Sequence, residues 1–356
     1  VNMRQARPFD HKGPQLVWSV GGTKSENADG WGNKGSLVAS NTFGNWGVLA
    51  GISFTNQKVA NKGFETIGWT NANLSAAQDT LANRNSTGGG NWTIPSTVPA
   101  NAGNGLTTGA TLDQAALLAL NPGLTIEQLD NAIIPRLGRP MNEYGTRDRI
   151  SGIFGLEWRP SDDFHAYLDT MYAHKRNEMQ RTDMDWVGRN GAMIPINMKV
   201  DRDDCSNGCV VTSATFANAQ AFLEYRPYTE TTDFYGINPG FDWHINDDLT
   251  LTASANYTRS TFHRESPSFL VITPPNSGMT VTYANDGGVP TMDSSLDLND
   301  PKNFGWTGGG RVNIQDEKRV TMTKGARADL KWGNSEFNLQ FGAAYDDTSR
   351  SITAYD

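Results

Sequence analysis

Hydrophobic and polar residues alternate along several segments of this chain, and the segments come in pairs joined by short polar turns. The clearest pairs are centred on residues 158–164, 243–249 and 332–337, and a tighter one on residues 43–46. In each pair an aromatic residue stands where the first segment ends. Alternation with a period of two predicts β-strands with one apolar face, and the short turns predict hairpins.

The pattern predicts about nine strands, with long polar connections at 56–148, 176–231 and 260–322. Short turns at one end, long loops at the other and aromatic residues beside the turns are typical of a transmembrane β-barrel. We therefore expect an all-β fold, part of a transmembrane antiparallel β-barrel with long extracellular loops. The expected strands cover residues 16–22, 35–43, 47–55, 150–159, 164–172, 234–243, 249–258, 326–332 and 337–343.

Composition agrees with a barrel. Only 37% of the 356 residues are hydrophobic, but in a barrel only alternate strand residues face lipid. The sequence has no apolar run of about 18 residues, which excludes a helical span. A net charge of −8 argues against a nucleic-acid partner. A soluble β-sandwich remains an alternative, although it does not explain why every second connection is long.

The ends of three strands carry tryptophans in the apolar register. We expect Trp158, Trp243 and Trp332 to lie at one level, on the rim with the short turns. In a membrane they would form part of an interfacial girdle, because tryptophan prefers the boundary between lipid and water.

The long connections hold two further local signals. Capping boxes at Thr111–Gln114 and Thr125–Gln128 predict short helices near 112–120 and 126–134; these form either a lid over the barrel mouth or simple loop packing. Cys205 and Cys209 lie in a polar loop and are predicted to form an exposed local disulfide. The rival interpretation, a metal-binding pair, lacks a second Cys/His pair.

No pattern of catalytic residues is present, since the five histidines are scattered. We therefore expect no enzymatic activity, no cofactor and no metal. An outer loop with several acidic residues offers oxygen ligands for Ca²⁺, but a solvated acidic loop is the simpler interpretation; these residues are Asp293, Asp297, Asn299 and Asp300. Charged residues in the polar register are interpreted as ladders lining a wet interior: Glu157, Arg159, His165, Asp169, Arg327, Asp329 and Lys331.

Ligand recognition is predicted in the first two long loops, which flank one hairpin and so emerge side by side. The candidate substrate-binding residues are Asn142, Tyr144, Arg147, Trp186 and Arg189. Aromatic faces beside amides and carboxylates suit sugars, whereas clustered arginine and tyrosine suit anionic iron chelates.

Four short segments carry a family resemblance: residues 1–10, 40–43, 63–69 and 156–164. They resemble TonB-dependent outer-membrane receptors, in particular the large proteobacterial branch associated with carbohydrate uptake. Residues 1–10 resemble the place where that family's plug domain passes into its barrel. It implies an N-terminal plug inside a barrel of about 22 strands. On this basis we expect an internal fragment, with residues 1–10 as the end of the plug domain and 11–356 as the N-terminal part of the barrel.

The expected function is therefore that of part of an active transporter in the outer membrane of a Gram-negative bacterium. It would import a nutrient, with a carbohydrate favoured and a siderophore as the alternative. The resemblance implies the TonB complex as a partner through the missing plug, together with outer-membrane lipid, the nutrient and, as a further candidate, a surface lipoprotein. The competing functions are a passive porin or autotransporter-type barrel and a soluble glycan-binding β protein.

Overall fold

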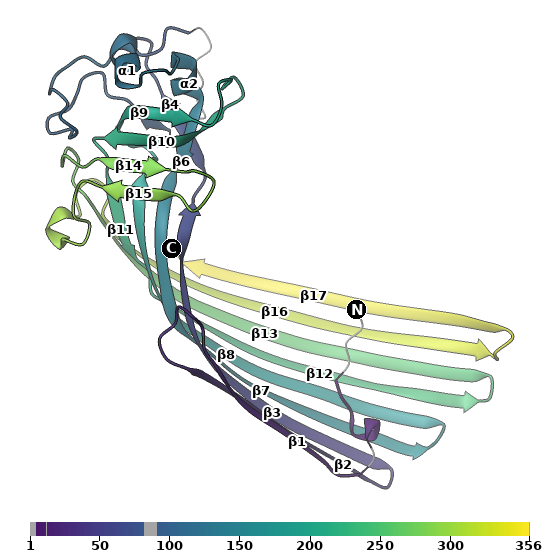
Figure 1. Ribbon diagram of the computed structural model, residues 1–356. Coiled ribbons are helices and arrows are strands. Elements are labelled where there is room, and N and C mark those ends of the chain that lie inside the picture. Colours follow the sequence, from purple (N-terminus) through teal and green to yellow (C-terminus); the bar gives the residue numbers. More distant parts are fainter. Residues whose placement is uncertain (1–4, 12, 82–90, 356) are drawn as a thin grey trace.

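The computed structural model describes residues 5–11, 13–81 and 91–355. About 64% of the chain is β-strand, and only two short α-helices, α1 (Gln114–Leu120) and α2 (Ile126–Asn131), occur in the described residues. The strands form one large sheet and one smaller sheet (Figure 1). The all-β prediction is confirmed.

The large sheet has ten strands, and all neighbours in it are antiparallel. Its order begins β1-β2-β3-β7-β8 and ends β13-β16-β17. Between β8 and β13 lie two shorter strands, β11 and β12, which pair with different lengths of both neighbours. Each expected strand falls within one of its strands, except that Phe337 lies just before the last. The bounds are β1 (Gln15–Thr23), β2 (Gly32–Phe43), β3 (Trp46–Thr66), β7 (Leu137–Ser161), β8 (Phe164–Val187), β11 (Ala221–Tyr225), β12 (Tyr228–Asn246), β13 (Leu249–Ile272), β16 (Arg311–Gly333) and β17 (Asn338–Tyr355).

The strands are much longer than the alternation predicts. β7 has 25 residues, and β8 and β13 have 24 each. The predicted loop boundaries are therefore wrong, because strands continue well into the expected connections. In those extensions polar residues occupy both faces, so alternation no longer marks the strand although the backbone ladder persists.

The smaller sheet has seven strands and was not predicted. It is built from the remaining parts of the three long connections and lies at the end of the large sheet opposite the short turns (Figure 1). We call it the outer sheet. Its strands are β4 (Trp69–Asn73), β5 (Trp92–Thr93), β6 (Ala132–Pro135), β9 (Ile194–Val200), β10 (Cys209–Ala217), β14 (Val281–Ala284) and β15 (Thr291–Ser294).

Both predicted helices exist and pack into the core of the outer sheet. Thr125 caps α2 in a full capping box with Gln128. The N-cap of α1 is Asp113, which accepts from the amide of Ala116, so the predicted box starting at Thr111 is wrong. Leu117 and Leu129 are buried in the hydrophobic core, so the contacts of both helices are those of loop packing.

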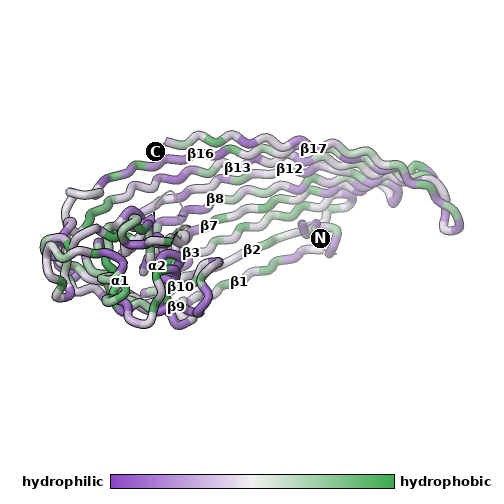
Figure 2. Tube along the Cα trace, turned by 90° about the horizontal axis from the view of Figure 1, so that it is seen from above, coloured by the Kyte–Doolittle hydropathy of each residue, from purple (hydrophilic) through white to green (hydrophobic). Residues whose placement is uncertain are grey.

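The large sheet presents two chemically different faces, because directly paired residues on antiparallel strands point to the same side. One register row, for example, joins Ala166, Phe241, Ala253 and Ala328, and the adjacent row joins His165, Asp242, Thr252 and Asp329. We call these sides the apolar face and the polar face. The resulting change of hydropathy from one residue to the next is visible along the strands in Figure 2.

Candidate functional site

A row of aromatic residues crosses the apolar face beside the short turns. Trp46 stacks on Trp158 with ring centroids 5.6 Å apart, Trp158 contacts Phe164 at 5.7 Å, and Phe164 contacts Trp243 at 6.4 Å. Trp332 pairs with Leu249, directly after the β12–β13 turn. The pairing places Trp158, Trp243 and Trp332 on one face and at one end, as predicted. We call this the turn-side aromatic row.

A second aromatic row crosses the same face further along the strands and was not predicted. Tyr172 pairs directly with Tyr235, whose ring lies 6.1 Å from that of Tyr257. Tyr345 lies on the same face, since it pairs with Ala326 of the row that continues into Ala255. The sequence signal was present, because Tyr172 and Tyr235 each fall in the apolar register eight residues from a turn-side aromatic, and Tyr257 lies eight residues from Leu249. We call this the far aromatic row.

Between the two rows the apolar face carries almost no polar groups. Along β12 the rows are separated by the eight steps from Trp243 to Tyr235, which is roughly 26 Å along an extended strand. Beyond the far row the same face becomes polar at once, with His174 bonded to Asp233 and Lys324 paired with Asp347. The apolar residues between the rows include Val48, Ala50, Phe154, Leu156, Ala166, Leu168, Ile237, Phe241, Leu251, Ala253, Ala328, Leu330, Phe341 and Ala343.

The polar face carries the charged residues that the sequence assigned to it, and several of them form ion pairs. Glu157 bonds His165 at 2.7 Å, and Arg327 donates to Asp329. Arg159 lies 3.7 Å from Glu157. Lys331 pairs with Thr250, in the register of this face. These contacts agree with the predicted charge ladder.

Residues 5–11 lie against this polar face rather than joining a strand. The Arg7 guanidinium donates to both carboxylate oxygens of Asp169, at 2.8 Å for the shortest contact, and lies 3.4 Å from the centroid of the Tyr167 ring. Both charged side chains are about nine-tenths buried. A buried, bidentate pair of this kind fixes position strongly, because neither partner tolerates loss of the other.

The next residues of this segment continue the contact towards the short turns. The Phe9 amide donates to Glu157 at 2.6 Å, and the Arg159 guanidinium lies 4.8 Å from the centre of the Phe9 ring. Pro8 sits over Gly47, where a Cβ atom would come within 2.6 Å of the proline Cβ. Glycine at 47 therefore permits this close approach. We call residues 5–10 the docked segment.

A second group of charged residues, most of them buried, lies where the large sheet meets the outer sheet. Arg139 donates to Asp185, Arg181 bonds Glu65 and Asp183, and Arg226 bonds Asp183. Glu224 lies near Arg139 and Arg226. Three arginines and four carboxylates leave one excess negative charge, and burial raises the pKa of Asp185 to about 6 although Arg139 opposes the shift.

The structure does not bring the five expected ligand-binding residues together. Asn142, Tyr144 and Arg147 lie within β7 rather than in a loop, and Arg189 is exposed just after β8. Trp186 was expected on an exposed loop, but it is completely buried against Phe216 and Tyr283. Sequence reasoning missed this because the outer sheet that covers Trp186 comes from distant parts of the chain.

Cys205 and Cys209 are bridged as predicted, with their Cα atoms 5.0 Å apart. The expected exposure of the bridge is wrong, because both residues belong to the hydrophobic core of the outer sheet. The acidic loop behaves as solvated turns: Asp297 accepts from the Asn299 amide and Asp300 from the Lys302 amide.

The chain was compared with protein-family models, curated proteins and solved structures, and none of them matches it significantly. Among the described residues, no helix is long and apolar enough to cross a membrane.

Proposed function

We propose that this chain is part of a transmembrane β-barrel in the outer membrane of a Gram-negative bacterium, and that the barrel is an active nutrient transporter of the TonB-dependent type. Residues 1–10 would be the end of its plug domain and residues 11–356 the first part of its barrel. The TonB complex would supply energy through the plug, and a surface lipoprotein is a possible further partner.

The two aromatic rows support a membrane position for the large sheet. Outer-membrane barrels carry an apolar band about 25 Å tall between two aromatic girdles. A strand tilt of about 40° turns the roughly 26 Å path between the rows into a height of about 20 Å, which is comparable with that band. A soluble sandwich would cover such a face with a second sheet. Here large side chains remain open, with Phe341 62% exposed and Trp332 51% exposed.

The docked segment is the observation that favours an active transporter over a passive pore. A porin needs no chain inside its lumen, and residues 1–10 would then form an ordinary strand or leader. Instead the described part of this segment lies across the polar face, held by Arg7 on Asp169 and by the Phe9 amide on Glu157. A chain fixed at this place suits the connection between a plug and its barrel.

A carbohydrate remains the favoured cargo. Trp69 in β4 and Trp306 in the loop before β16 expose about half of their surfaces. Exposed indole faces bind the apolar faces of sugar rings, whereas an anionic chelate needs clustered exposed cations. The arginines near the outer sheet are largely committed to carboxylates, as Arg139 and Arg181 show.

Uptake of a labelled oligosaccharide by cells that express the full-length protein tests the proposal. Active transport should stop when an uncoupler collapses the proton-motive force, and it should also stop in cells that lack the TonB protein. Uptake that continues at the same rate under both conditions would indicate a passive pore. Recovery of the protein as a soluble monomer without detergent would refute the membrane position itself.

A further inference from the structure

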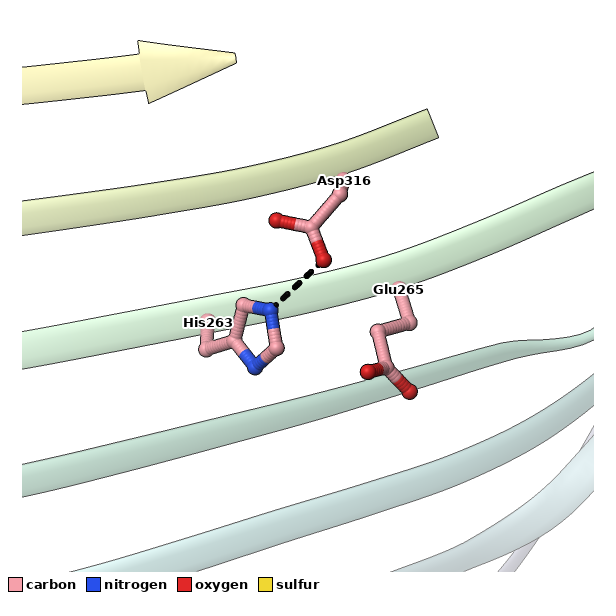
Figure 3. Close-up of side chains that lie close together, drawn as sticks. All are labelled: His263, Glu265 and Asp316. Atoms are coloured by element: carbon pink, nitrogen blue, oxygen red, sulfur yellow. Dashed lines mark hydrogen bonds and ion pairs between the residues drawn. The ribbon is translucent and has the colours of Figure 1, made fainter. Parts of the chain in front are cut away.

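Three potential metal ligands meet on β13 and β16, beyond the far aromatic row. His263 Nε2 lies 2.8 Å from a carboxylate oxygen of Asp316, and Glu265 is the direct cross-strand partner of Asp316 (Figure 3). One ligand atom from each of the three residues lies within 4.8 Å of the others. We propose that His263, Glu265 and Asp316 form a binding site for a divalent transition-metal ion, with Zn²⁺ as its representative.

The donor set suits this class of ion. One imidazole nitrogen and two carboxylate oxygens are common zinc ligands, and three protein ligands leave a position open for water. Calcium and magnesium prefer all-oxygen sites, so the imidazole favours a transition metal. Binding would replace the bond between His263 and Asp316 by bonds from both residues to the ion, which requires only small side-chain movements.

The surrounding charges and solvent permit such an ion. Lys318 is the cross-strand partner of His263, and its positive charge would oppose the binding of a cation. With a neutral imidazole, the two carboxylates and Lys318 leave one excess negative charge. His263 and Asp316 are each 39% exposed, and His263 lies six residues beyond Tyr257, roughly 20 Å along the strand. The site is therefore reached from water.

The same face contains a natural comparison that lacks the third ligand. His174 bonds Asp233 at 2.8 Å, with side-chain exposures of 38% and 50%. It is thus a histidine–carboxylate pair of the same length and similar exposure on the same face of the sheet. Among the described residues, only the cluster at His263 brings three such ligands together. If a simple pair were enough for binding, both sites would take up metal.

Calorimetric titration of the full-length, detergent-purified protein with ZnCl₂ tests the proposal. Wild type should bind one tight equivalent. His263→Ala and Asp316→Asn should each weaken that binding at least tenfold, since even the loss of a residue that only supports a ligand typically costs about 10–100-fold. Glu265→Gln should weaken binding to a similar extent, because it reduces the cluster to a histidine–carboxylate pair like that of His174 and Asp233. The matched control His174→Ala should bind like wild type.

A second readout separates loss of ligands from loss of fold. With Cu²⁺ as the probe, electron paramagnetic resonance should show nitrogen coordination in wild type and in His174→Ala, and no nitrogen coordination in His263→Ala. Circular dichroism and the electrophoretic shift on heating should be the same in all variants. Wild-type zinc affinity in His263→Ala, or an equal loss in His174→Ala, would overturn the proposal and leave His263–Asp316 as an ion pair alone.

Discussion

Arg7 is the side chain on which the docked segment depends most. Replacing it with Ala removes the partner of a buried carboxylate at Asp169, a change that typically costs about 3–5 kcal/mol. Because Arg7 binds the docked segment to β8, we expect the loss to appear as release of that segment. Hydrogen exchange at the Phe9 amide, which donates to Glu157, should accelerate by at least tenfold.

Gln5→Ala is the matched control for this experiment. Gln5 donates a 3.3 Å hydrogen bond to the Phe154 carbonyl at an exposed position, so its removal should leave exchange at Phe9 nearly unchanged. Equal protection of the Phe9 amide in wild type and Arg7→Ala would mean that other contacts hold the segment.

Asp185 should make the junction with the outer sheet sensitive to pH. Its pKa is raised from 3.8 to about 6, so at intermediate pH the folded protein binds a proton that the unfolded chain does not. This contribution to stability is fully present below about pH 4 and is lost as the pH rises through about 6. The difference in pKa corresponds to about 3 kcal/mol.

Hydrogen exchange of β8 and β11, corrected for its intrinsic pH dependence, measures this effect. Protection near Asp185 should decrease from pH 5 to pH 7 in wild type and should lose that dependence in Asp185→Asn. Asp347→Asn, on the edge strand β17, should retain it. A wild-type protection factor that rises with pH would show that the shift has the opposite sign.

At the scale of elements, Trp186 is a large side chain at the core of the outer sheet. It is fully buried and packs against Phe216 of β10 and Tyr283 of β14. Trp186→Ala should therefore destabilise the outer sheet by about 3–5 kcal/mol. Tyr144→Ala should cost little, since Tyr144 is 52% exposed. Protease cleavage within residues 188–221 should increase for the first variant only; unchanged cleavage would exclude a structural role for Trp186.

The large sheet was predictable where one face is apolar, and the outer sheet was not. Alternation such as Leu251, Ala253 and Ala255 against Thr250 and Thr252 is a local signal with a period of two, so it survives in the sequence alone. The outer sheet depends instead on pairing between distant segments, as when Phe216 meets Val281.

The same distinction between local and long-range signals explains which parts of the candidate site could be predicted. The charges of the polar face were found because they fall in the polar register of predicted strands. The prediction for Trp186 was wrong because the local sequence does not distinguish an exposed loop tryptophan from a buried one. The ring that covers Trp186 belongs to Phe216, 30 residues later in the chain. The docked segment was expected from resemblance, whereas its contacts with Tyr167 and Asp169 depend on side chains more than 150 residues away.

At the scale of the whole molecule, the proposed membrane position predicts opposite outcomes for two adjacent residues of β13. Ala253 lies midway between the aromatic rows, with Phe241 and Ala328 beside it on the apolar face. Thr252 points to the polar face, between Asp242 and Asp329. An arginine at the middle of the lipid-facing band costs about 2–4 kcal/mol, whereas an arginine between two carboxylates gains charge pairing.

Ala253→Arg should thus reduce folding of the full-length protein into lipid vesicles, and Thr252→Arg should fold as well as wild type. The fraction that migrates as the folded, heat-sensitive band in electrophoresis measures this directly. In detergent micelles, which adapt to a local charge more easily, the difference should shrink. If both variants fold equally into vesicles, the apolar face does not contact lipid at this level; if only Thr252→Arg fails, the two faces are assigned the wrong way round.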